Sequence, residues 1–181
     1  MKRIVWTFGL IAGAIMAAMM AITVPFMHQI GDKVEWEVIG YTTMILAFLM
    51  VYFGIRTYRD NVLAGAIGFG RAFKVGILIT LVASTCYVAT WEVLYHTTAS
   101  DFVEKYAARA IEKARASGAT DAQIEARKQE MAKFADMYQN PLVNVAMTYL
   151  EVFPVGVVVV LVSAGVLSRR KSGAIPEPAR A

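Results

Sequence analysis

Four long apolar blocks, which contain no Lys or Arg, alternate with polar segments along the chain and make up about half of it. A bilayer core of about 30 Å requires roughly 20 residues in helical conformation. Backbone groups in lipid have to be paired within their own segment, and none of the blocks shows the alternation of a barrel strand. The pattern therefore predicts an all-α, integral membrane four-helix bundle with helices over about 4–27, 36–55, 75–96 and 142–168.

The connection at 97–141 has a different pattern, with seven basic and seven acidic residues. Its apolar residues recur at helical spacing in two stretches, and Gly118 stands between them as a suitable helix C-terminal residue. The two apolar stripes consist of Phe102, Val103, Tyr106, Ala110 and Ile111, and of Ile124, Met131, Phe134, Ala135 and Tyr138. Each stretch begins with capping-box spacing, at Asp101/Glu104 and at Thr120/Gln123. We predict an extramembrane helical hairpin whose stripes pair, with surface ion pairs such as Asp101/Lys105 and Glu130/Lys133.

Basic residues flank the predicted helices on one side. They are Lys2, Arg3, Arg56, Arg59, Arg71, Lys74, Arg169, Arg170 and Lys171. Because Lys and Arg in short loops remain in the cytoplasm, both termini are predicted to be cytoplasmic and the hairpin periplasmic, in a bacterial inner membrane. Residues 172–181 are predicted to form a disordered cytoplasmic tail. A cleaved signal peptide is the rival interpretation of the first block, but the apolar run reaches Met27 without a polar segment, which favours a retained helix.

Composition narrows the range of functions. The chain is 57% hydrophobic, with a mean hydropathy of +0.51, as a membrane protein would be. Its formal charge of +4 is explained by the basic residues that flank the predicted helices on one side, so nucleic-acid binding is not predicted. Two histidines and one cysteine, Cys86 within the third block, cannot supply the usual hydrolytic or redox constellations. We therefore predict a protein that is not an enzyme and has no cofactor and no bound metal.

Two carboxylates within the apolar blocks, Glu92 and Glu151, are the strongest candidates for a functional site. A charged group inside a bilayer is costly and is a functional candidate for that reason. The predicted antiparallel course of the third and fourth helices allows both carboxyl groups to meet, with Trp91 and His96 nearby, as a site for a proton or a cation. A small metal site is a weaker alternative, in which Glu92 and His96, four residues apart on one helical face, would be joined by His28 or Glu35. The structural interpretation, which we favour slightly, is that each carboxyl group is hydrogen-bonded and only fixes packing.

Interface anchors follow the second block. Aromatic rings precede Arg56, Arg59 and Asp60, and the glycine-rich stretch 61–74, which includes Arg71 and Lys74, is predicted to lie along the cytoplasmic interface. The lipid bilayer is thus the first predicted partner.

Small residues recur every fourth position in the first block, at Gly9, Gly13, Ala17 and Ala21. Such a face packs against another helix, either of a second copy in a homo-oligomer or of the same chain. We favour packing within the chain, since four helices have to pack together in any case.

Several motifs together resemble one family. They are the segments 52–60, 68–76, 91–92, 138–141 and 151–156. In these the chain resembles the bacterial membrane family known as domain of unknown function 4199, over nearly its whole length. The resemblance implies a small four-helix inner-membrane protein with a variable outer connection. It supplies no catalytic residue, but it places Arg56, Arg59, Asp60, Glu92 and Glu151 in characteristic stretches of the family.

The sequence therefore leads to two functional hypotheses. The first is a non-enzymatic binding, sensing or scaffold protein that contacts an envelope protein through residues 101–139. The alternative is a small oligomeric carrier of an ion or solute, linked to protons through Glu92 and Glu151.

Overall fold

Six helices make up the part of the chain that the computed structural model describes, residues 1–30 and 36–168. Their bounds are α1 Lys2–Ile30, α2 Trp36–Val62, α3 Phe69–Thr97, α4 Phe102–Ala116, α5 Asp121–Tyr138 and α6 Pro141–Ser168. The tail predicted at 172–181 and the basic residues at 169–171 lie outside the described residues.

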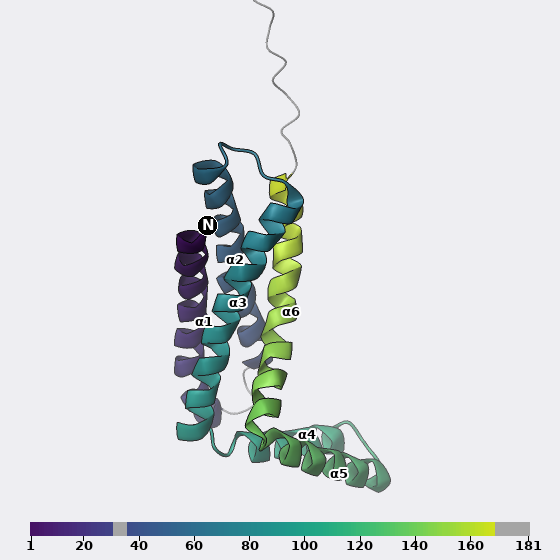
Figure 1. Ribbon diagram of the computed structural model, residues 1–181. Coiled ribbons are helices and arrows are strands. Elements are labelled where there is room, and N and C mark those ends of the chain that lie inside the picture. Colours follow the sequence, from purple (N-terminus) through teal and green to yellow (C-terminus); the bar gives the residue numbers. More distant parts are fainter. Residues whose placement is uncertain (31–35, 169–181) are drawn as a thin grey trace, which may run out of the picture.

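Four of the helices run side by side as an antiparallel bundle (Figure 1). Each contains a stretch long and apolar enough to cross a membrane: Lys2–Val24, Val38–Val62, Phe69–Thr97 and Pro141–Ser168. Helix α3 packs against α1 and α6, and α2 contacts all three of these helices. The predicted all-α fold with four potential membrane spans is confirmed. We call the end of the bundle at the N-terminus the terminal end and the opposite one the hairpin end.

Small residues let the helices approach closely at the centre of the bundle. A Cβ added at Gly13 would lie 2.5 Å from the Cβ of Cys86, and one at Gly9 would lie 2.7 Å from the Cβ of Val82. Both glycines therefore face α3, so the part of the small face at Gly9 and Gly13 packs within the chain, whereas Ala21 is exposed. Cys86 is a half-buried part of this contact.

Large apolar side chains cover the outside of the bundle. Exposed examples occur on all four long helices: Trp6, Leu10, Ile45, Leu46, Leu81, Val93, Leu150 and Val162. A water-soluble monomer rarely exposes so continuous an apolar surface, whereas lipid chains solvate it well. The arrangement is that of an integral membrane protein.

Helix α3 begins earlier than the sequence predicted. Residues 69–74 were expected to lie along the interface, but they form the first turns of α3. The reason is packing, because Ala72 and Val75 are buried and extend the inner face of α3 toward the terminal end. The true connection between α2 and α3 is only 63–68, in which Gly65 has a φ of +91°.

The α4–α5 hairpin has most of its predicted local signals. Thr120 and Gln123 form the capping box, and Gly118 has a φ of +80°, as a helix C-terminal turn requires. The predicted cap at Asp101 is wrong, because its side chain makes no capping hydrogen bond and pairs with Lys105 one turn later. On α5, a carboxylate oxygen of Glu130 lies 2.7 Å from a guanidinium nitrogen of Arg127, three residues earlier. The partner that the sequence predicted for Glu130 was Lys133, three residues later.

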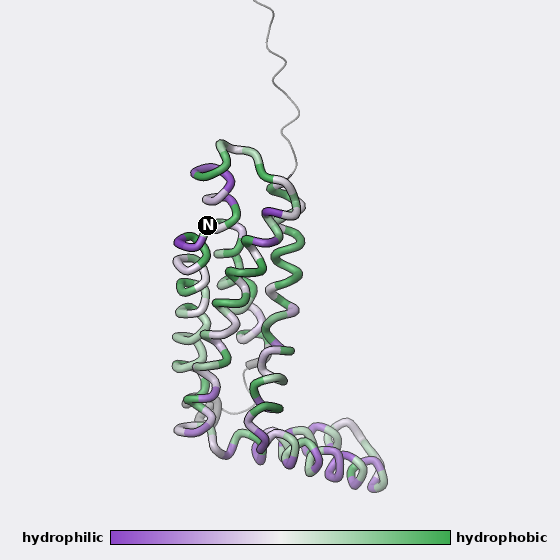
Figure 2. Tube along the Cα trace, viewed as in Figure 1, coloured by the Kyte–Doolittle hydropathy of each residue, from purple (hydrophilic) through white to green (hydrophobic). Residues whose placement is uncertain are grey.

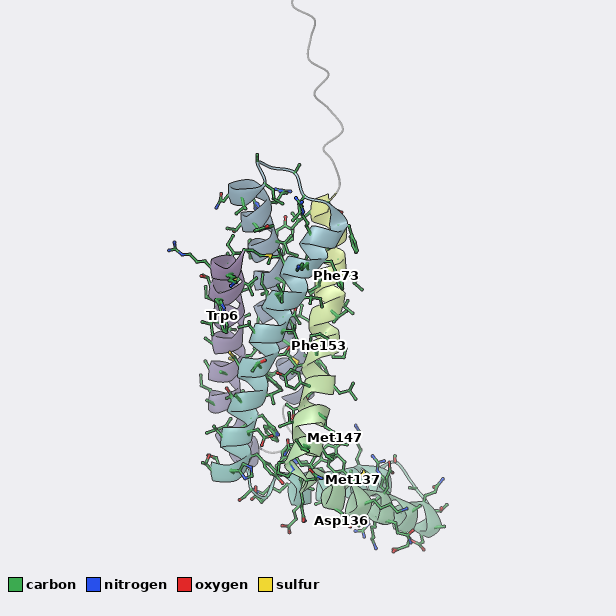
Figure 3. The ribbon with its side chains drawn as sticks, in the orientation of Figure 1. Trp6, Phe73, Asp136, Met137, Met147 and Phe153 are labelled. Carbon is green, nitrogen blue, oxygen red and sulfur yellow. The ribbon has the colours of Figure 1, made fainter. Side chains whose placement is uncertain are left out.

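The hairpin lies across the end of the bundle and projects sideways from it (Figure 1). Figure 3 places Met137 on the side of the hairpin that faces the bundle and Asp136 on the side that faces away. Met137 is 50% exposed, near the base of the hairpin where α5 ends. If the four long helices span a bilayer, the hairpin lies along its surface, and Met137 is on the side that faces the bundle.

Candidate functional site

The packing of α3 against α6 fixes the relative height of the two intramembrane carboxyl groups. Gly76 packs against Val160, and further along, the hydroxyl groups of Thr85 and Tyr149 lie 2.6 Å apart. The register continues to the hairpin end, where Trp91 contacts Asn144. Glu92 follows Trp91 directly and thus lies level with the start of α6.

Glu151 lies deeper in the bundle than Glu92. It comes seven residues after Asn144, which corresponds to about 10 Å along the helix axis at 1.5 Å per residue. The structure therefore does not bring the two carboxyl groups together. Glu151 is exposed on α6 and makes no hydrogen bond or ion pair with the described residues.

Glu92 is half-buried near the hairpin end of α3. Its Oε2 lies 3.6 Å from Nε2 of His96, one turn later, and its buried Oε1 has no hydrogen-bond partner among the described residues. The His96 side chain is 66% exposed, so this contact is at the surface. No group of three potential metal ligands occurs in the described part of the chain. The side chains of His28 and Glu35, either of which the alternative metal site would use, lie outside that part.

Trp91, which precedes Glu92 in the sequence, directs its indole N–H into a buried polar network and not to a carboxylate. Its indole N–H donates to the phenol oxygen of Tyr138 at 2.9 Å and to Oδ1 of Asn144 at 3.1 Å. The hydroxyl of Thr148 donates to the backbone carbonyl of Asn144 at 2.9 Å and lies 3.4 Å from its Oδ1. These four residues, which we call the Trp91 network, join α3, α5 and α6.

Aromatic rings surround the network and continue into the hairpin. The Trp91 ring meets Phe102 edge-on with centroids 4.8 Å apart, and Phe134 lies 5.2 Å from Tyr138. Edge-to-face and tilted ring pairs at such distances stabilise by about 0.5–1.5 kcal/mol each beyond burial. The hairpin is thus fixed to the bundle at its base by polar and aromatic contacts.

The sequence did not lead us to predict Asn144 as a site residue, and the structure shows that it is only 1% exposed. The available signal was an amide side chain near the start of the fourth apolar block. Buried amides require hydrogen-bond partners. The partner, however, is 53 residues away in sequence and could not be identified from spacing.

The phenol of Tyr138 is the titratable member of the network outside the membrane spans. Burial raises its pKa to about 12, although the Trp91 N–H opposes this by favouring the phenolate. Because an unfolded tyrosine has a pKa of about 10, hairpin attachment should be fully stable below pH 10 and weaken as the pH rises toward 12. The absorbance difference between the wild type and Tyr138→Phe should show tyrosinate forming near pH 12 when folded and near pH 10 when denatured. A midpoint near 10 in the folded protein would contradict the buried network.

The predicted interface residues gather at the terminal end, where hydrophilic segments reappear (Figure 2). Asp60 is shared by two arginines of α2: its Oδ1 lies 2.7 Å from Nε of Arg59, and its Oδ2 lies 3.6 Å from Nε of Arg56. Arg71 and Lys74 lie on the first turns of α3 and are exposed. The five predicted anchors therefore form two groups, one charge-paired and one that makes no ion pair with the residues that the structure describes.

These observations define the class: a helical integral membrane protein with a bundle of four long apolar helices and a hairpin of two shorter helices at one end. Residues 7–169 match the family described as a protein of unknown function (DUF4199), so the chain belongs to that family. No curated protein and no solved structure matches the chain.

Proposed function

We propose that the protein is a non-catalytic binding component of a bacterial inner membrane, which presents its α4–α5 hairpin on the outer surface to a partner protein of the envelope. The attachment and the position of the hairpin are the observations that support this proposal most directly. It is fixed at its base by the Trp91 network and extends sideways beyond the bundle (Figure 1). A rigidly attached arm of this kind is a suitable element for recognition, since it loses little conformational freedom on binding.

The distribution of basic residues supports the orientation. Among the described residues, Lys2 and Arg3 begin α1, and four further cations lie near the end of α2 and the start of α3, all at the terminal end (Figure 2). With this end in the cytoplasm, the positive-inside rule is satisfied and the hairpin lies in the periplasm.

The side of the hairpin that faces away from the bundle carries charges of both signs. Asp136 lies on this side (Figure 3), and Lys133 is one turn earlier on the same helix and exposed. Mixed charges favour a protein partner with complementary charges over a polyanion, which a uniformly basic surface would favour.

The non-catalytic part of the proposal is supported by the separation of the candidate residues. Glu92 and Glu151 lie about two helical turns apart in depth, and Cys86 packs against Gly13. The same separation removes the geometric basis for a shared proton between the two carboxyl groups, so we do not propose the carrier function.

Two neighbouring positions provide the test. A photo-crosslinking amino acid at Asp136 should capture a discrete protein in intact cells, whereas the same group at Met137, on the bundle side, should capture lipid. The protein adduct at Asp136 should decrease several-fold in a Lys133→Glu background and persist with Lys133→Arg. Equal protein capture from both positions, or none from Asp136, would overturn the proposal.

A further inference from the structure

A basic hollow lies at the terminal end of the bundle, where α1, α2 and α3 meet. It is lined by Met1, Tyr58, Arg71, Lys74 and Val75 and has a volume of about 360 Å³. This volume is within the range of about 300–1,000 Å³ that is typical of small-molecule sites. The lining set contains two basic side chains, the amino-terminal residue and a phenol, but no carboxylate.

The cations of the hollow differ from Arg56 and Arg59 in having no acidic partner among residues 1–30 and 36–168. In the described part of the chain, Asp60 pairs with Arg56 and Arg59, whereas neither Arg71 nor Lys74 forms an ion pair. Three residues apart on α3, these two lie on the same side of the helix. The arrangement therefore leaves an uncompensated positive charge directed at one hollow.

The position of the hollow relative to the membrane indicates where its ligand comes from. Trp6 is 58% exposed on α1, and Phe69 is 47% exposed at the start of α3. Figure 3 shows Trp6 on the outside of the bundle toward the terminal end, and the half-buried Phe73, whose ring stacks on that of Phe69, on α3. Aromatic rings at this level mark the boundary between headgroups and acyl chains. A ligand in the hollow can thus place a phosphate among the cations and apolar chains along these rings.

We propose that the basic hollow binds the headgroup phosphate of an anionic phospholipid, with Arg71 and Lys74 as the charged ligands and the Tyr58 hydroxyl as a hydrogen-bond donor. The arginine guanidinium supplies a fork of donors that matches phosphate oxygens, and the lysine ammonium adds a compact charge. Net negative headgroups are preferred over zwitterionic ones, because the hollow offers no acidic group to an attached ammonium. This site is independent of the hairpin and of its partner.

The test compares two double variants with the same change in charge. The full-length protein in mild detergent is mixed with phosphatidylglycerol or phosphatidylcholine, and bound lipid is counted by native mass spectrometry. We expect the wild type to retain phosphatidylglycerol preferentially. Arg71→Gln/Lys74→Gln should weaken this retention by roughly 10- to 30-fold, given the usual contribution of each basic residue near anionic lipid. The matched control, Arg56→Gln/Arg59→Gln, should retain the lipid.

Three results would overturn the site. They are equal loss of lipid in both double variants, equal retention of the two lipids by the wild type, and displacement of phosphatidylglycerol by inorganic phosphate or glycerol 3-phosphate at similar concentration. The last would assign the hollow to a soluble phosphate. Melting temperatures measured without added lipid identify any variant that has lost its fold, and in that case the single substitutions Arg71→Gln and Lys74→Gln replace the double one.

Discussion

Replacing Gly156 with alanine should destabilise the bundle by about 1–3 kcal/mol, as overpacking of a well-packed core usually does. The added Cβ would lie 2.9 Å from Cζ of Phe48 and closer still to the methyl group of Thr80. Both neighbours are fully buried, so neither can move without displacing α2 or α3. Valine at this position should have a larger effect than alanine.

Gly165 provides a matched control on the same helix. A Cβ added there meets nothing within 4 Å. Gly165→Ala should therefore be neutral or slightly stabilising, because alanine is favoured over glycine in helices by up to about 1 kcal/mol. The comparison is made by thermal unfolding of the purified proteins in mild detergent. Equal melting temperatures for the two variants would show that α6 does not approach α2 and α3 at Gly156.

Replacing Trp91 with alanine should release the hairpin from the bundle. Removing a buried aromatic side chain costs about 3–5 kcal/mol, and here it also removes the indole N–H that donates to both Tyr138 and Asn144. The loss of stability affects the contact between α3, α5 and α6 at the base of the hairpin. The four-helix bundle should therefore persist while the hairpin becomes mobile.

Limited trypsin digestion measures this effect, because the hairpin contains lysine and arginine in both helices. Cleavage between 102 and 138 should be at least about tenfold faster in Trp91→Ala, which corresponds to about 1.4 kcal/mol in local opening. Trp91→Phe retains a ring but not the donor and should be intermediate. Trp6→Ala is the control, since Trp6 is 58% exposed at the opposite end of the bundle. Equal digestion of Trp91→Ala and Trp6→Ala would refute the role of Trp91 in attaching the hairpin.

The intramembrane carboxylates show where sequence reasoning reached its limit. Their presence in apolar blocks was visible, and so was the opposite direction of the two helices. Their separation depends on the register between α3 and α6, which is set by close contacts such as Gly76 with Val160 and Thr80 with Gly156. A shift of two turns does not change the apolar pattern, so the pattern carries no information about register.

The basic residues near the second and third helices show the same limit. Arg56, Arg59, Arg71 and Lys74 appear equivalent in sequence, as cations flanking apolar blocks. Their environments differ because Asp60 lies within reach of the first two alone. The fold further brings Met1, from the start of the chain, and Tyr58, from the preceding helix, beside the other two.

The sequence by itself determined the class of protein, the presence of four potential membrane spans and the helical hairpin between the last two. These features follow from short-range physics, namely the length of apolar runs, helical periodicity and local caps such as that of Thr120 with Gln123. Only the tertiary structure decided that Gly9 and Gly13 serve packing within the chain and that Trp91 holds the hairpin through Asn144 and Tyr138. Those outcomes depend on which helix faces bury against one another, and contacts between distant segments leave no periodic trace in a single sequence.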